Sequence, residues 1–94
     1  MATMFVRHKV GNYENWKRAY DEFAPVRKKR GVTRATVHHD PDDPNTIIVT
    51  HQFTDMKAVS EFVNSEELKS AMEKAGVSSP PEFWFGEDIE QTEY

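Results

Sequence analysis

Residues 4–16 read MFVRHKVGNYENW, and this stretch contains one predicted strand and the start of one predicted helix. Residues 4–10 alternate between two faces, with Met4, Val6, His8 and Val10 on one and Phe5, Arg7 and Lys9 on the other. A period of two predicts a half-buried strand. Gly11 interrupts the pattern, and Asn12 is a favourable N-cap for a helix. The stretch therefore predicts a strand that leads directly into a helix, with one histidine on its apolar face.

Aromatic residues repeat along the predicted helix at intervals of three and four residues. They are Tyr13, Trp16, Tyr20 and Phe23, so a single stripe of the helix carries all four. We expect Pro25 to interrupt this helix or begin a new turn, and Gly31 to end it. The basic run VRKKRG, residues 26–31, is interpreted as a solvated helix end, where cations offset the negative end of the helix dipole.

The rest of the chain shows the same two periodicities. Residues 32–39 (VTRATVHH) and 46–53 (TIIVTHQF) are rich in β-branched types and are separated by DPDDPN, which predicts an antiparallel hairpin. Asp55 is expected to cap a second helix that restarts near Ser65 and ends at Gly76. A last strand is predicted over residues 82–89, with Phe83, Phe85 and Ile89 on one side and Trp84 on the other.

The order of predicted elements is β-α-β-β-α-β, which predicts an α+β, ferredoxin-like fold with residues 1–94 as one domain. Its usual form is a four-stranded antiparallel sheet with both helices on one face and the strand order 4-1-3-2. The bare sheet face would carry Phe5, Val32, Ile48 and Trp84. Because exposed apolar patches usually bind a partner, we expect a homodimer that forms through this sheet face.

Composition and charge exclude several classes of function. The 94 residues carry a formal net charge of −4, whereas nucleic-acid-binding proteins usually carry a basic stripe, so no nucleic-acid partner is expected. The chain has no cysteine, which removes thiol chemistry and fits a reducing compartment. No apolar run approaches the roughly 20 residues of a membrane span, and the N-terminus lacks the features of a signal peptide. We therefore expect a cytoplasmic protein with no membrane partner.

The predicted topology makes His8 the candidate catalytic residue. It brings the last strand and the first helical turn close to His8, which predicts an aromatic-lined pocket for a small planar ligand. The expected substrate-binding residues are Tyr13, Trp16, Phe62, Phe83 and Phe85. Within this pocket His8 would accept a proton as a general base, and Tyr20 would donate a hydrogen bond to a developing oxyanion.

Structural interpretations of the same residues remain open. A single inward histidine is often a core residue that a carbonyl or hydroxyl group satisfies, and Trp16 and Phe62 fit ordinary packing. His51 lies toward the opposite end of the sheet from His8, which favours a structural or dimer-edge role. His38 and His39 flank the acidic turn and are expected to be exposed. Since strand spacing keeps His8 and His39 roughly 10 Å apart, no metal site is expected.

Two segments, together with the order of elements, resemble the antibiotic biosynthesis monooxygenase-like proteins of the dimeric α+β barrel superfamily. The first segment is H-x-V-x-x-Y-x-x-W-K, here His8 to Lys17, and the second is S-x-E-L-K, here Ser65 to Lys69. The resemblance implies a homodimer and a pocket between the sheet and the helices. Some members of this family oxidise polycyclic aromatic compounds without a metal or flavin, so no cofactor is expected, while others cyclise or isomerise their substrates.

The expected function is therefore that of a cofactor-independent monooxygenase, cyclase or isomerase that acts on a small aromatic or polyketide-like compound. Two alternatives remain at this stage. The protein would be a non-catalytic dimer that binds a small molecule in the same pocket, or a dimer module whose pocket is filled by its own side chains.

Overall fold

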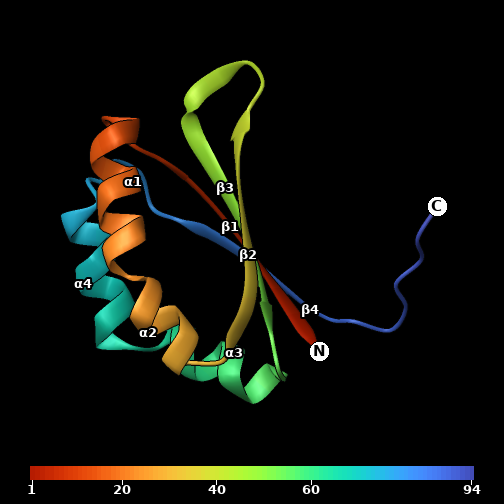
Figure 1. Cartoon of the computed structure of the whole chain (residues 1–94). Coiled ribbons are helices and arrows are strands. Elements are labelled where there is room, and N and C mark those ends of the chain that lie inside the picture. Colours follow the sequence, from red (N-terminus) through yellow and green to blue (C-terminus); the bar gives the residue numbers. More distant parts are fainter.

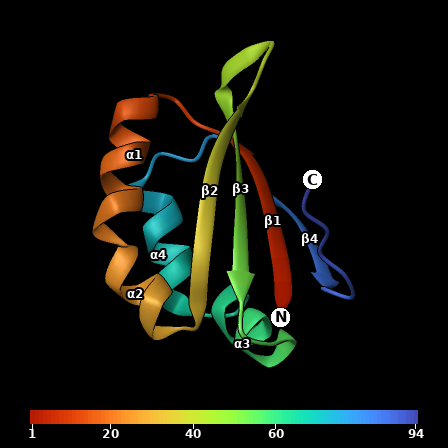
Figure 2. The same ribbon diagram turned by 45° about the vertical axis from the view of Figure 1, so that its right-hand side comes forward.

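The computed structural model describes residues 1–94 and confirms the predicted α+β, ferredoxin-like fold (Figure 1). The strands are β1 (Ala2–Lys9), β2 (Val32–Asp40), β3 (Asp43–Phe53) and β4 (Glu82–Glu87). The helices are α1 (Tyr13–Glu22), α2 (Ala24–Lys29), α3 (Met56–Val63) and α4 (Glu66–Lys74). All strand pairs are antiparallel, and the sheet order β2-β3-β1-β4 is the predicted order read from the opposite edge (Figure 2).

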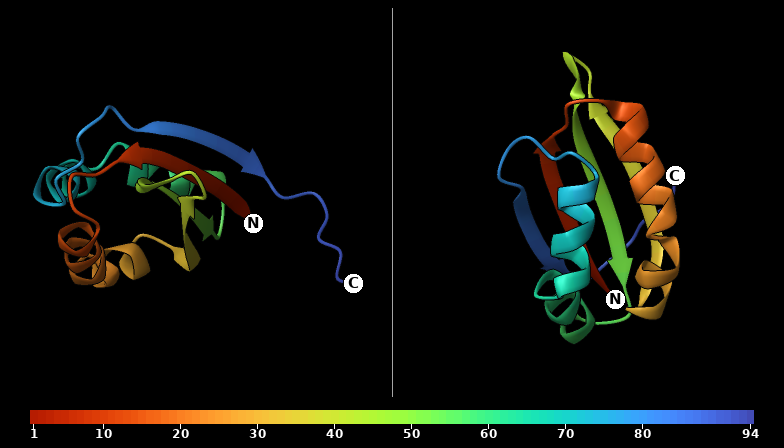
Figure 3. Two further views of the ribbon diagram at one scale, coloured as in Figure 1. Left: turned by 90° about the horizontal axis from the view of Figure 1, so that it is seen from above. Right: turned by 90° about the vertical axis from the view of Figure 1, so that its left-hand side faces the viewer.

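The helices cover one face of the sheet and leave the other face bare. Figure 1 shows the sheet nearly edge-on with the helices on its left, and the right-hand view of Figure 3 shows α1 and α4 in front of the strands. After β4 the chain runs away from the helices to the C-terminus (left-hand view of Figure 3). None of the four helices combines the length and apolar character that are needed to cross a membrane.

Local sequence signals account for where the helices begin and end. Three helices begin at a side-chain cap in which the side-chain oxygen accepts a backbone N–H: Asn12 from Asn15 at 2.9 Å, Asp55 from Ala58 at 2.8 Å and Ser65 from Leu68 at 3.2 Å. Pro25 lies in the first turn of α2, where a missing N–H costs no helical hydrogen bond. Gly31 and Gly76 follow α2 and α4 with φ angles of 97° and 72°, which favour glycine.

The strands differ from the prediction in their bounds, since β1 begins at Ala2 rather than residue 4 and β3 at Asp43 rather than residue 46, and in two details of their faces. The register between β2 and β3 shifts between Val32 and Arg34, so the alternation of β2 is interrupted at Thr33. Val32 consequently pairs with Phe53 and packs against the buried core, and its predicted place on the bare face is wrong. The last strand ends at Glu87, and Ile89 beyond it is almost fully exposed rather than turned inward.

The alternation of β1 places the core between the sheet and the helices. Met4, Val6 and His8 are buried, as the sequence predicts, and Ala2, which lies before the predicted strand, is buried on the same face. One buried cluster combines Met4 and Val6 with Phe53 and Phe62, and a second surrounds Trp16 at the other end of the sheet. The candidate base His8 therefore faces the helices, at the end of the core that contains Trp16.

Candidate active site

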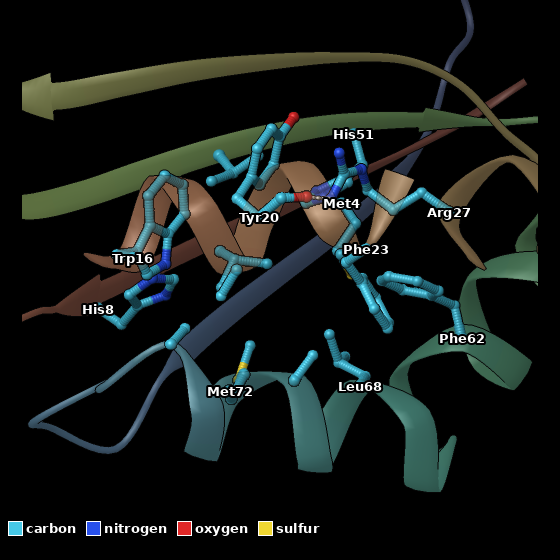
Figure 4. A pocket seen from close by; sticks show the side chains of 15 residues that line it. Met4, His8, Trp16, Tyr20, Phe23, Arg27, His51, Phe62, Leu68 and Met72 are labelled. Carbon is cyan, nitrogen blue, oxygen red and sulfur yellow. Dashed lines mark hydrogen bonds between the residues drawn. The ribbon is translucent and has the colours of Figure 1, made fainter. Parts of the chain in front are cut away.

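A cavity of about 60 Å³, measured for the centre of a water molecule, lies between the sheet and the helices (Figure 4). Twelve of its fifteen lining residues are hydrophobic, and they come from every helix except α2 and from strands β1 and β3. The three other lining residues are His8, Arg27 and His51. The cavity is therefore an apolar space with three polar side chains in its wall.

His8 borders the cavity at the Trp16 end of the core. Its side chain is 5% exposed, and the ring centroids of His8 and Trp16 lie 5.8 Å apart. Neither ring nitrogen has a hydrogen-bond partner in the protein. Burial lowers the pKa of His8 from 6.5 to about 4, so the imidazole is neutral at pH 7. A neutral imidazole with two free nitrogens both accepts and donates a proton without a change in the protein around it.

His51 borders the same cavity from β3. It is 6% exposed, its Nδ1 has no hydrogen-bond partner, and burial followed by the charge of Arg27 lowers its pKa to about 4. His51 pairs with Met4, four residues along β1 from His8, so the two histidines lie about 13 Å apart along the strands. The predicted position of His51 toward the opposite end of the sheet from His8 is confirmed, but a place at the dimer edge is wrong, because both imidazoles line one cavity.

A stack of three side chains forms the helical wall of the cavity. The rings of Trp16 and Tyr20 lie 5.1 Å apart and nearly parallel, at 21°. The guanidinium carbon of Arg27 lies 3.7 Å from the centre of the Tyr20 ring, and its Nη1 donates a hydrogen bond to the Tyr20 carbonyl oxygen at 2.7 Å. In Figure 4 this guanidinium lies beside His51, at the end of the cavity away from His8.

Comparison with known families adds a second line of observation to this geometry. The model of the family described as antibiotic biosynthesis monooxygenase matches residues 1–74, from the start of the chain to the end of α4. The chain belongs to the antibiotic biosynthesis monooxygenase family. The matched segment contains every residue that lines the cavity except Ala75. Among curated proteins, none matches the sequence.

Solved structures with the antibiotic biosynthesis monooxygenase fold superpose on nearly the whole chain. SnoaB, a cofactor-independent oxygenase from Streptomyces nogalater, is 15% identical over 96% of this chain and 94% of that chain, with a TM-score of 0.77. A candidate antibiotic biosynthesis monooxygenase from Bordetella bronchiseptica is 12% identical over 94% and 96% of the two chains, with a TM-score of 0.79. A protein of unknown function from Nitrosomonas europaea is 19% identical over 99% and 93%, with a TM-score of 0.71. At these identities the likeness is one of fold.

The structure brings together four of the seven residues that the sequence proposes for the site. His8, Trp16, Tyr20 and Phe62 all line the cavity. Tyr20 contributes its ring, and its hydroxyl group forms no hydrogen bond with another residue. Tyr13 lies outside the lining, half-exposed, with its ring 6.0 Å from that of Trp16.

Phe83 and Phe85 also lie outside the cavity lining. Strand β4 is the edge strand beyond β1, so its side chains are one strand further from the space that α1 and α4 cover. The two rings stack on each other at 6.2 Å and 4°, and Phe85 is 49% exposed. The expectation that they begin beside His8 fits the register, in which Phe83 pairs with Val6, but Phe83 packs against the core outside the cavity and Phe85 is half-exposed.

Arg27 and His51 are the polar cavity residues that the sequence interpretation did not assign to the site. The basic run predicts a solvated helix end, yet Arg27 is only 8% exposed, while its neighbours Lys28 and Lys29 are exposed. The signal was present, because Arg27 follows Phe23 by four residues and so continues the aromatic stripe of α1. His51 likewise alternates with Val49 and Phe53 on the buried face of β3.

A groove between the helices adjoins the cavity from outside. Its volume is about 260 Å³, and it shares Ala19, Phe23 and Ala71 with the cavity. Across this groove Arg30 of the α2 end pairs with Glu67 of α4, with its Nε 3.0 Å from the carboxylate. The wall that the groove and the cavity share consists of Phe23 and two small side chains, Ala19 on α1 and Ala71 on α4. No three side chains of the metal-ligating types lie close enough together to hold an ion.

Proposed function

We propose that this member of the antibiotic biosynthesis monooxygenase family is a cofactor-independent monooxygenase, cyclase or isomerase for a small aromatic or polyketide-like compound, with His8 as its general base. The observation that carries the proposal is the position of His8: a buried imidazole with both nitrogens free, at the wall of an apolar cavity. Such a cavity suits a planar ligand with few polar groups.

The chemistry begins with a proton transfer to His8. The substrate loses a proton from an acidic C–H group next to a carbonyl or phenol, and the electron pair stays on the substrate. In a monooxygenase reaction these electrons pass to O₂; one oxygen atom becomes the new carbonyl, and the other leaves as water with the two hydrogens of the original CH₂ group. In a cyclase the same carbanion attacks a carbonyl carbon of the substrate, the C=O π bond opens, and the oxygen takes the proton from His8. In an isomerase the carbanion regains the proton at another position.

The surroundings of His8 fit this order of events. In the empty cavity the pKa of His8 is about 4, because burial penalises the imidazolium. Proton transfer from a neutral substrate creates an anion next to the imidazolium, and their attraction in an apolar site raises the pKa of His8. The histidine is therefore fully unprotonated before the reaction and becomes a stronger base as the substrate anion forms.

The size of the cavity limits the substrate. The cavity of about 60 Å³ is well below the roughly 300–1,000 Å³ of typical ligand pockets, so in this conformation it accepts only a small ring system. Larger substrates require α1 and α4 to separate, which they would do along Ala19 and Ala71. We therefore expect single-ring and two-ring substrates to react faster than three-ring ones.

The test is oxygen consumption and substrate loss with a quinol and an anthrone, comparing wild type with His8→Asn. General-base catalysis typically contributes about 100-fold to 10,000-fold, so His8→Asn should lose at least about 100-fold in kcat/KM. The matched control is His38→Asn, which changes an exposed histidine of β2 and should turn over like wild type. Equal turnover by His8→Asn and wild type would remove His8 as the base.

Non-catalytic binding is the second candidate, and the low pKa of His8 favours it, because an imidazole of pKa about 4 is a weak base until an anion forms. A binding protein would gain thermal stability from the same aromatic compounds without consuming them. A ligand at 100 times its Kd adds about 2.7 kcal/mol to folding stability, so a thermal-shift screen run beside the turnover assay separates the two functions.

Homodimer formation through the bare sheet face is part of the proposal. Trp84 is 50% and Phe5 is 41% exposed on that face, and the two residues pair across β1 and β4. Half-buried Ile48 lies on the same face of β3, opposite Arg7. A second copy that stacks its own sheet against this one would cover these side chains in a two-fold contact.

A further inference from the structure

The strongest unexplained feature of the cavity is a buried cation without an anion. Arg27 is 8% exposed, and no carboxylate lies within salt-bridge distance of it. The carboxylate that acts on it electrostatically, Asp21, is already bound by Lys17 at 2.6 Å. The only hydrogen bond of its side chain is the one from Nη1 to the Tyr20 carbonyl oxygen. Buried charges in proteins are normally paired, because an unpaired one is costly to remove from water.

Arginine stays charged in this position. Burial lowers the pKa of Arg27, but a guanidinium is effectively always protonated in proteins. Its guanidinium carbon lies 3.7 Å from the centre of the Tyr20 ring and its Nη1 donates to the Tyr20 carbonyl oxygen, which leaves the edge formed by Nε and Nη2 without a hydrogen-bond partner. Two parallel N–H groups on that edge match the two oxygens of a carboxylate.

His51 lies beside this cation with a nitrogen that also has no partner. Figure 4 shows the two side chains next to each other at this end of the cavity, and both belong to its lining. A neutral imidazole donates one N–H, and its Nδ1 is buried without a partner. Phe23 and Phe62 pack around the same end of the cavity, and apolar surroundings of this kind strengthen a charge-assisted hydrogen bond.

We propose that the Arg27–His51 end of the cavity is a carboxylate subsite, so that the protein binds small planar organic acids with the carboxylate on Arg27 and His51 and the ring toward His8. This proposal specifies organic acids as the substrate class of the proposed function. It rests on that function only for the proton transfer to His8, whereas the binding of the acid is independent of it. The ligand supplies the missing anion of Arg27 and the missing partner of His51 in one group.

Binding of matched acids and alcohols tests the subsite. The probes are benzoate and 2-naphthoate, each compared with its neutral alcohol, benzyl alcohol and 2-naphthylmethanol, by isothermal titration at pH 7. A charge-assisted pair in a dry site should give the acids about tenfold or greater preference over the alcohols. Equal affinity for acid and alcohol, or no binding of either acid by the wild type, would overturn the proposal.

Substitutions then locate the anion. Arg27→Gln should lose most of the preference for acids, and Arg27→Lys should keep part of it, since lysine retains the charge but not the two-pronged geometry. Lys28→Gln removes the same charge from an exposed neighbour and should bind benzoate like wild type. If Lys28→Gln weakens acid binding as much as Arg27→Gln, the effect is one of overall charge and the subsite is wrong.

A wild-type measurement keeps the test independent of folding of the variants. Titration with benzoate should shift the NMR signals of the Arg27 Nε–H and the His51 ring, and benzyl alcohol should not. Shifts confined to other residues would contradict the proposal. Turnover is a separate readout: a protein that binds benzoate through Arg27 but reacts with no substrate has a carboxylate subsite without the proposed enzyme function.

Discussion

The two buried histidines should make the protein acid-sensitive in a defined range of pH. In the folded protein the pKa of His8 and of His51 is about 4, against 6.5 for the ordinary group. The unfolded chain therefore takes up protons at these residues that the folded chain excludes. Their contribution is constant above pH 6.5, and stability is lost as the pH falls from 6.5 toward 4.

The size of this effect follows from the two pKa values. The difference of 2.5 between 6.5 and 4 corresponds to about 3.4 kcal/mol for each histidine once the pH is below 4. Between pH 7.5 and pH 5.5 the loss is smaller, about 1.3 kcal/mol for each histidine and thus nearly 3 kcal/mol for the pair. The carboxyl groups with lowered pKa, Asp43 and Glu67, protonate at lower pH and add little in this interval.

The assay is urea unfolding followed by tryptophan fluorescence at pH 7.5 and 5.5. His8→Gln and His51→Gln should each remove about half of the pH-dependent loss, and the double variant should remove nearly all of it, whatever each substitution costs at a fixed pH. His38→Gln, which changes an exposed histidine, should behave like wild type. If the double variant loses as much stability on acidification as wild type does, the two imidazoles are not held neutral by burial, and the role of His8 as an unprotonated base loses its support.

Two further predictions concern the sheet face and a turn. Trp84→Asp puts a charge on the bare face, so light scattering should show the mass of one chain where wild type shows two, with unchanged circular dichroism; Ser70→Asp, which adds the same charge on exposed α4, should stay dimeric. A Trp84→Asp protein that remains a dimer would place the interface elsewhere. Gly31→Ala should lower the free energy of unfolding, measured with urea, by about 1 kcal/mol or more. The reason is that φ is 97° at this position and the new Cβ would lie 3.3 Å from that of Ala58. Gly11→Ala, where nothing lies within 4 Å, should stay within about 0.5 kcal/mol of wild type, and equal effects at both glycines would argue against backbone strain at Gly31.

Most of the fold follows from local signals that this sequence states clearly. The alternation of residues 4–10 predicts that His8 faces the helices, and the capping residues Asn12, Asp55 and Ser65 predict where three helices begin; the structure confirms both. The irregularity at Thr33 could not be predicted, because threonine is an ordinary strand residue and the shift arises from pairing with β3. The local sequence does not distinguish a strand with strict alternation from one in which a β-bulge interrupts the alternation at a single residue.

The errors at the site have a different cause. Phe83 and Phe85 have the right alternation, but whether they reach the cavity depends on how far the helices extend over an edge strand, which no local pattern encodes. Arg27 lies in a basic run, and the charge of that run favours a solvated helix end as the interpretation. Its position four residues beyond Phe23 instead continues the buried stripe of the helix, and the structure shows that Arg27 is buried. Position on a periodic stripe was the better guide to burial than residue type.

The same reasoning explains why polar residues interrupt the apolar patterns where they do. His8 interrupts the buried face of β1, His51 that of β3, and Arg27 the aromatic stripe of the helices. In a core this small, each substitution of an apolar residue by a polar one removes packing and leaves polar atoms to be satisfied. Packing alone gives no reason for three such interruptions to meet, yet all three line one cavity, where the two histidines have ring nitrogens without a hydrogen-bond partner and Arg27 has no carboxylate in salt-bridge distance. A ligand that supplies those partners accounts for all three at once, and the acid-against-alcohol titration asks whether an organic anion is that ligand.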